Sequence, residues 1–167
     1  MTSATHHIPG LVLTDHTFRV PLDHARAHAA TIEVFARAVS AAGKATDDLP
    51  WLLFLQGGPG FAAPRPLTNS GWIKRAVSDY RVLLLDQRGT GRSTPLTFQT
   101  LAHMPTPQIQ ADYLKHFRAD AIVQDAEWIR RALLGESARW SVLGQSYGGF
   151  CATHYLSVAP HALREVF

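Results

Sequence analysis

A serine between two glycines, in the pentapeptide Gly-Gln-Ser-Tyr-Gly at 144–148, is the residue best placed for nucleophilic chemistry. The pentapeptide follows a short apolar run at 140–143 and precedes a stretch with helical character. A sharp strand-to-helix turn lifts its central side chain clear of the backbone, and the N-terminus of the helix favours a developing oxyanion. We therefore predict that Ser146 is a nucleophile. An ordinary glycine-rich turn is the alternative.

A second glycine-rich stretch, Gln-Gly-Gly-Pro-Gly at 56–60, directly follows another apolar run. A serine that attacks a carbonyl group needs N–H donors where negative charge develops. In a strand–turn–helix arrangement of this kind, one donor comes from the residue after the nucleophile, here Tyr147, and one from an earlier loop. We predict that Gly58 supplies the second donor, with Gly57 as the alternative. Gln56 and Gly57 are predicted to border the substrate pocket.

The third glycine-rich stretch, Asp-Gln-Arg-Gly-Thr-Gly-Arg-Ser at 86–93, also follows an apolar run. Asp86 is expected to be buried at a strand end, so it must find a partner, and Arg88 or Arg92 could supply a charge-assisted pair. We interpret this loop, with Asp86 and Arg88, as a scaffold for the pocket wall. Direct contact of either arginine with substrate is the alternative. The glycines do not open a helix, so a phosphate-binding loop is not expected.

The pattern of apolar residues predicts an α/β fold that would bring these three loops together. Segments 11–22 and 31–39 alternate as half-buried antiparallel strands do, whereas 51–55 and 82–85 are continuously apolar, as in parallel strands covered on both faces. Helices are expected at 70–78, 108–117, 119–134 and 147–158, a long loop at 87–107 and the start of a further strand at 163–167. Helices should cover both faces of the sheet, and the loops after the parallel strands should meet at one edge.

Composition narrows the class of protein. The 167 residues are 46% hydrophobic and 17% charged, as in one globular domain. The net charge of +3 is scattered, so nucleic-acid binding is not expected, and the absence of a long apolar run argues against a membrane span. No secretory signal is visible, and a single cysteine, Cys151, fits the reducing cytoplasm where we place the protein. No metal-ligand spacing is present, so we expect no metal or other cofactor.

Together the three loops resemble those of the proline iminopeptidase (prolyl aminopeptidase) family of α/β-hydrolases, from about Phe18 onward. Phe61 and the Pro-Arg-Pro at 64–66 look like the longer bacterial subgroup, and Gln56 stands where the family usually has histidine. The resemblance implies an α/β-hydrolase fold. It also implies a serine peptidase that removes N-terminal proline from peptides through an acyl-enzyme on Ser146, without a cofactor.

The acid and the base that a serine nucleophile needs are not evident in this sequence. The order in this fold is serine, then acid, then histidine, and only 21 residues follow Ser146. His154 lies about 12 Å along the next helix, and His161 is no better placed. Cys151, on the same helix, is interpreted as inert packing.

We therefore expect residues 1–167 to be the N-terminal part of a single α/β-hydrolase catalytic domain, truncated near Phe167. The acid, the base, the cap and the remaining strands would lie beyond that point, so the chain by itself should have no efficient peptidase activity. Two alternatives remain open: another serine α/β-hydrolase, such as an esterase or amidase, and a non-catalytic α/β module. The exact substrate and the oligomeric state are left open.

Overall fold

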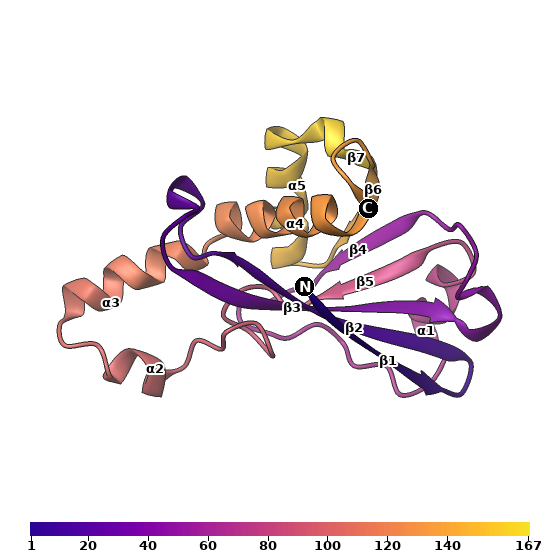
Figure 1. Cartoon of the computed structure of the whole chain (residues 1–167), viewed down its shortest axis with the longest axis horizontal. Coiled ribbons are helices and arrows are strands. Elements are labelled where there is room, and N and C mark those ends of the chain that lie inside the picture. Colours follow the sequence, from indigo (N-terminus) through magenta and orange to yellow (C-terminus); the bar gives the residue numbers. More distant parts are fainter.

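The computed structural model describes all residues from 1 to 167 and is built on one seven-stranded mixed sheet (Figure 1). The strands are β1 (Thr2–Ile8), β2 (Leu11–Pro21), β3 (Thr31–Ala41), β4 (Trp51–Leu55), β5 (Arg81–Leu85), β6 (Trp140–Gly144) and β7 (Leu163–Val166). Their order across the sheet is β1-β2-β3-β5-β4-β6-β7. Pairing is antiparallel from β1 to β5 and parallel from β5 to β7.

Helices cover both faces of this sheet, as the sequence predicted. They are α1 (Gly71–Ala76), α2 (Phe98–Ala102), α3 (Pro107–Leu114), α4 (Ala119–Leu134) and α5 (Tyr147–Val158), with single 3₁₀ turns η1 (His24–Arg26), η2 (Ala42–Lys44), η3 (Lys115–Phe117) and η4 (Pro160–Ala162). Figure 1 shows α4 and α5 together on one side, and α1 beside the opposite end of β4 and β5. The helices α2 and α3 extend away from the sheet and contain no buried residue.

The continuously apolar strands are buried on both faces. In β4, Leu53 and Leu55 belong to a cluster of 23 buried residues beneath α4 and α5, whereas Leu52 and Phe54 belong to a cluster of 10 residues beneath α1. Successive side chains of a strand point to opposite faces, so an apolar run with no polar alternation requires cover on both. The prediction of parallel strands at 51–55 and 82–85 is confirmed.

Two elements differ from the expectation. The strand β1 was not expected, and it makes the antiparallel part of the sheet three strands wide instead of two. Its residues before Ile8 are exposed, so no apolar alternation marks it, and it is held by pairing along its whole length with residues 11–17 of β2. The loop expected at 87–107 contains the short helix α2, which a capping box between Thr97 and Thr100 starts.

No helix of this structure has the length and apolar character needed to cross a membrane. The three glycine-rich loops follow β4, β5 and β6, which are neighbours in the sheet and parallel to one another. The loops therefore meet at one edge of the sheet, where ligands bind in open α/β sheets.

Candidate active site

Ser146 occupies the turn between β6 and α5 with a strained backbone. Its φ of 53° and ψ of −116° lie in a region that residues other than glycine rarely adopt. Such a conformation costs of order 1–3 kcal/mol and persists only where the surrounding structure enforces it. The serine is exposed, and its hydroxyl group makes no hydrogen bond to any other side chain or backbone group. The strain presents a free hydroxyl at the carboxyl edge of the sheet.

The two flanking glycines are needed because main-chain atoms approach them closely. A Cβ atom on Gly148 would lie 1.9 Å from the carbonyl oxygen of Leu55, and one on Gly144 would lie 2.5 Å from the carbonyl oxygen of Gly148. Real Cβ atoms do not approach backbone oxygens so closely, and the backbone cannot give way as a side chain can. The absence of these side chains lets α5 begin directly against the end of β4.

The loop after β4 lies against Ser146. A Cβ atom on Gly57 would be 3.1 Å from the Cβ atom of Ser146. The N–H groups of Tyr147, Gly57 and Gly58 have no hydrogen-bond acceptor in this structure. Tyr147 is the first residue of α5, so its N–H group has no acceptor within the helix. Free main-chain N–H groups are therefore found near Ser146 in both segments that the sequence indicated, the start of α5 and the loop after β4.

Gln56 contributes to this edge through its main chain. Its carbonyl oxygen accepts a hydrogen bond of 2.9 Å from Nε2 of Gln87, which ties the loop after β4 to the loop after β5. Gln56 is partly buried, and no hydrogen bond is formed by its own side-chain amide.

The predicted partners of Asp86 are wrong. Asp86 is fully buried, and its carboxylate pairs with the guanidinium group of Arg65. It also accepts hydrogen bonds from the main-chain N–H groups of Ala63, at 2.9 Å, and Arg92, at 2.8 Å. The side chain of Arg92 instead pairs with Asp15. Arg65 lies 21 residues before Asp86 in an irregular segment, so sequence proximity did not indicate it.

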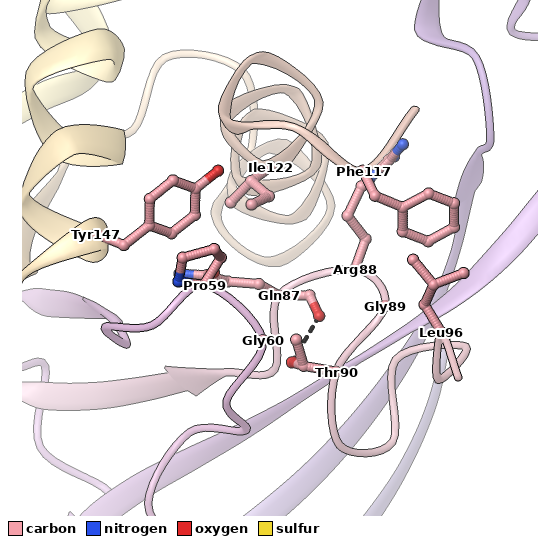
Figure 2. Close-up of a pocket in the computed structure, with 10 residues that line it drawn as sticks. All are labelled: Pro59, Gly60, Gln87, Arg88, Gly89, Thr90, Leu96, Phe117, Ile122 and Tyr147. Carbon is pink, nitrogen blue, oxygen red and sulfur yellow. Dashed lines mark hydrogen bonds between the residues drawn. The ribbon is translucent and has the colours of Figure 1, made fainter. Parts of the chain in front are cut away.

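Arg88, the other predicted partner, binds α4 instead. Its Nε donates to Asp125 at 2.7 Å, and its terminal nitrogens donate to the carbonyl oxygens of Pro21, Leu22 and His116 at 2.7–3.0 Å. Neither Arg88 nor Asp125 has more than 1% of its side chain exposed. Figure 2 shows the Arg88 side chain extending from the loop past Phe117. Arg88 therefore ties the loop after β5 to α4 and to the end of β2.

A cavity of about 230 Å³ lies between these loops and α4 (Figure 2). Figure 2 shows Pro59 and Tyr147 at one end of this cavity and Leu96 and Phe117 at the other, and Ile122 adds to the apolar part of the wall. A second hollow of about 480 Å³ shares Pro59, Phe117 and Tyr147 with it. The second hollow continues along Asp120, Phe150 and His154. Ser146 itself lines neither hollow, but Tyr147, the residue that follows it, lines both.

No histidine of the chain forms a hydrogen bond with Ser146. His154 lies two turns along α5 and faces the second hollow, and His24 is bonded to Asp125 at 2.9 Å. Burial raises the pKa of the Cys151 thiol to about 11, so the thiol stays protonated at neutral pH. No group of three or more His, Cys, Asp or Glu side chains is arranged to hold a metal ion.

Sequence reasoning missed three side chains that hold this edge together, namely Arg65, Asp125 and His24. Each acts on a partner at least 21 positions away. The sequence offered only a chemical indication of these contacts. Charged residues expected in buried positions require partners of opposite charge, and Asp125 falls on the face of α4 that packs on the sheet.

Several known proteins are similar to this chain in sequence. The family model described as alpha/beta hydrolase fold matches residues 50–167. A proline iminopeptidase of Aeromonas sobria is 54% identical over 169 residues, covering 100% of this chain and 39% of the relative. The proline iminopeptidase aneH of Aspergillus aculeatus is 44% identical over 170 residues, covering 98% of this chain and 38% of the relative. The chain thus spans well under half the length of these relatives.

Solved structures agree on the fold. An alpha/beta hydrolase from Novosphingobium aromaticivorans superposes with a TM-score of 0.58 at 19% identity, over 91% of this chain and 42% of the other. An alpha/beta fold family hydrolase from Bacillus anthracis superposes with a TM-score of 0.56 at 17% identity, over 92% and 42%. Because the family model covers most of the sequence and the strained serine stands at the turn where this fold carries its nucleophile, this chain belongs to the alpha/beta hydrolase fold family.

Proposed function

We propose that the whole protein is a serine aminopeptidase that releases N-terminal proline from peptides. The proposed chemistry rests on one observation: Ser146 is strained and exposed, and the free N–H groups of Tyr147 and of the loop after β4 lie near it. The substrate is inferred from the 54% identity with a proline iminopeptidase over the full length of this chain. Fold alone does not determine substrate.

In the proposed reaction, Oγ of Ser146 attacks the carbonyl carbon of the N-terminal prolyl residue. The carbonyl oxygen becomes an oxyanion, which the N–H groups of Tyr147 and Gly58 stabilise. Collapse of the intermediate breaks the C–N bond, releases the shortened peptide as an amine, and leaves a prolyl ester on Ser146. Water then attacks the ester, and proline leaves. The apolar walls beside Tyr147 suit a pyrrolidine ring.

Proton transfer in these steps needs a general base, since a hydroxyl at its ordinary pKa is a poor nucleophile. No histidine contacts Ser146 in this chain, so we assign the base and its acid partner to another part of the whole protein. Residues 1–167 are accordingly proposed as the N-terminal part of one catalytic domain. The coverage of 39% of the Aeromonas relative supports this proposal.

We also propose a cytoplasmic location. Its support is the single cysteine, which is buried and unpaired. Fractionation of cells of the source organism, with proline-releasing activity followed in each fraction, tests the location. Activity confined to the exported fraction contradicts it.

The function is tested by assaying the whole protein with a proline-linked chromogenic amide and with a simple chromogenic ester. Ser146→Ala is expected to lower kcat/KM for the amide by about 10⁴- to 10⁶-fold, as removal of a nucleophile does in serine hydrolases. Ser157→Ala, an exposed serine on the same helix, is the matched control and should leave turnover unchanged. Ester turnover without proline release makes the protein an esterase instead, and no Ser146-dependent turnover of either substrate refutes the hydrolase assignment.

A further inference from the structure

The loop between β4 and α1 is held in an unusual way. Residues 56–67 form no backbone–backbone hydrogen bond and belong to no helix or strand. Most main-chain groups of a folded protein pair with one another, so a segment without such pairs takes its shape from side chains. This segment includes Gly57, which adjoins Ser146, and the next residue, Gly58. The bonds that fix it thus decide where the N–H groups of this loop point.

Few side-chain bonds reach this segment. Gln87 binds its first residue, Gln56, and Asp86 binds the N–H group of Ala63 at 2.9 Å. Ala63 is only 3% exposed, so this bond is shielded from water. The carboxylate of Asp86 is the only buried charge that reaches the segment, and it sits at the end of β5, a rigid position.

Arg65, which belongs to this segment, contacts both Ala63 and Asp86. One terminal nitrogen of its guanidinium group donates to the carbonyl oxygen of Ala63 at 2.8 Å, and the other contacts the carboxylate of Asp86. The guanidinium carbon lies 5.1 Å from the centre of the Phe35 ring on β3. Arg65 therefore joins its own loop, the end of β5 and β3 in one place, and its planar, forked donor set suits such a junction.

We propose that Arg65 is a positioning residue for the oxyanion donors. By binding Asp86 and the carbonyl oxygen of Ala63 together, it holds segment 56–67 in the arrangement that keeps Gly57 against Ser146, and with it the free N–H groups of Gly57 and Gly58. Gly57 approaches Ser146 so closely that a small displacement of the segment changes the donor geometry. A misplacement of about 1 Å caused by a distant mutation can cost about 100-fold in rate. This inference rests on the proposed function of Ser146.

The experiment uses the whole protein with Arg65→Met, which removes the donors but keeps an apolar stem, and Arg65→Lys, which keeps the charge. For the proline-linked amide, Arg65→Met is expected to lower kcat by about 10- to 100-fold with little change in KM, since the lost interaction acts in the transition state. Arg65→Lys should recover part of the loss. Arg75→Met, at a largely exposed arginine of α1 that pairs with Asp79, is the matched control and should behave as wild type.

A second readout separates positioning from general destabilisation. A proline-derived aldehyde forms a tetrahedral adduct with the serine and places an oxyanion among the donors, whereas pyrrolidine, which has no carbonyl or carboxyl oxygen, does not. Arg65→Met should weaken inhibition by the aldehyde by the same factor as kcat, and leave inhibition by pyrrolidine unchanged. An unchanged kcat, or equal weakening of both inhibitors, overturns the inference, whatever happens to the melting temperature.

The failure of this inference is distinguishable from failure of the proposed function. If wild-type protein releases no proline in a Ser146-dependent manner, the proposed function is wrong. The positioning role is then read from the rate at which a fluorophosphonate, which loses fluoride as its phosphorus bonds to Oγ, labels Ser146. Slower labelling of Arg65→Met than of Arg75→Met supports the role, and equal rates overturn it.

Discussion

The loop after β4 and the loop after β5 lie side by side at the same edge of the sheet, yet they are built in opposite ways. Residues 56–67 form no backbone–backbone hydrogen bonds. The loop at 86–93 is densely bonded. Gly89 donates to the carbonyl oxygen of Ser93, and the N–H and hydroxyl groups of Thr90 both donate to that of Gln87.

On the proposed mechanism, this difference separates two tasks. A loop that stabilises a developing charge must keep N–H groups free of internal acceptors, and such a loop cannot fix its own shape by main-chain pairing. The neighbouring loop satisfies its own main chain and also offers the carboxylate of Asp86 and the amide of Gln87 to the first. Mutations in the supporting loop should therefore cost stability first, whereas mutations in the other should cost activity first.

The largest effect is expected where the supporting loop is anchored to α4. Arg88→Met removes the guanidinium group from the buried carboxylate of Asp125 and leaves three carbonyl oxygens without a donor. Breaking a buried ion pair by removing one partner costs about 3–5 kcal/mol. Urea unfolding of the whole protein measures the loss. Arg131→Met, at a half-exposed arginine that pairs with Glu127, should change stability by less than about 1 kcal/mol. Equal effects of the two variants contradict the anchoring role.

Two glycine-to-alanine substitutions, one in each loop, compare the loops directly. A Cβ atom on Gly91 would lie 2.2 Å from Oδ2 of Asp86, and Gly91 has a φ of 51°. Gly91→Ala should therefore destabilise the protein by about 1–3 kcal/mol. Gly57→Ala places its methyl group against the flexible amide of Gln145 and beside Ser146, so it should lower kcat at least tenfold with a smaller loss of stability. Urea unfolding and steady-state kinetics on both variants measure the contrast, and a reversed order refutes the division of tasks.

The smallest effect is expected at the outer end of the supporting loop, where Arg92 and Arg37 bind Asp15 at 2.6–3.0 Å. Burial opposes ionisation of Asp15, but the hydrogen bonds from both arginines outweigh it and hold the pKa of its carboxyl below the ordinary value. A lowered folded-state pKa contributes stability above the unfolded value, near 3.8, and that stability is lost as pH falls through the lower folded value.

Asp15→Asn should accordingly be less stable than wild type at pH 7, and the difference should shrink as pH falls below the unfolded pKa. Midpoints of urea unfolding between pH 7 and pH 3 measure this. Asp48→Asn, at an exposed carboxylate without an ion pair, is the control. A difference that is constant across this range shows that the ionisation of Asp15 does not matter.

The elements around the serine were predictable because local chemistry specifies them. The apolar run of β6 and the glycines of the turn place the start of α5 at Tyr147, and Pro160 follows its end at Val158. The continuous apolar runs of β4 and β5 likewise identify buried parallel strands. In these segments the signal lies within about ten residues of the feature it predicts.

The supporting contacts could not be predicted because they join distant parts of the chain. Asp86 requires a partner, but proximity in the sequence favours Arg88 and Arg92, and only the fold brings Arg65 to it. The strand β1 shows the same limit. Its residues are mostly polar and exposed, and only pairing with β2 makes them a strand.

The order of strands has a consequence for synthesis on the ribosome. The strand β4 lies between β5 and β6, and both neighbours follow it in the chain. Its apolar run is made early, but its second partner is complete only at Gly144, after another 89 residues (56–144). At about 5–20 residues per second this interval lasts roughly 4–18 s. During that time the nascent chain carries a strongly apolar strand with at least one edge unpaired, which is the kind of segment that chaperones shield.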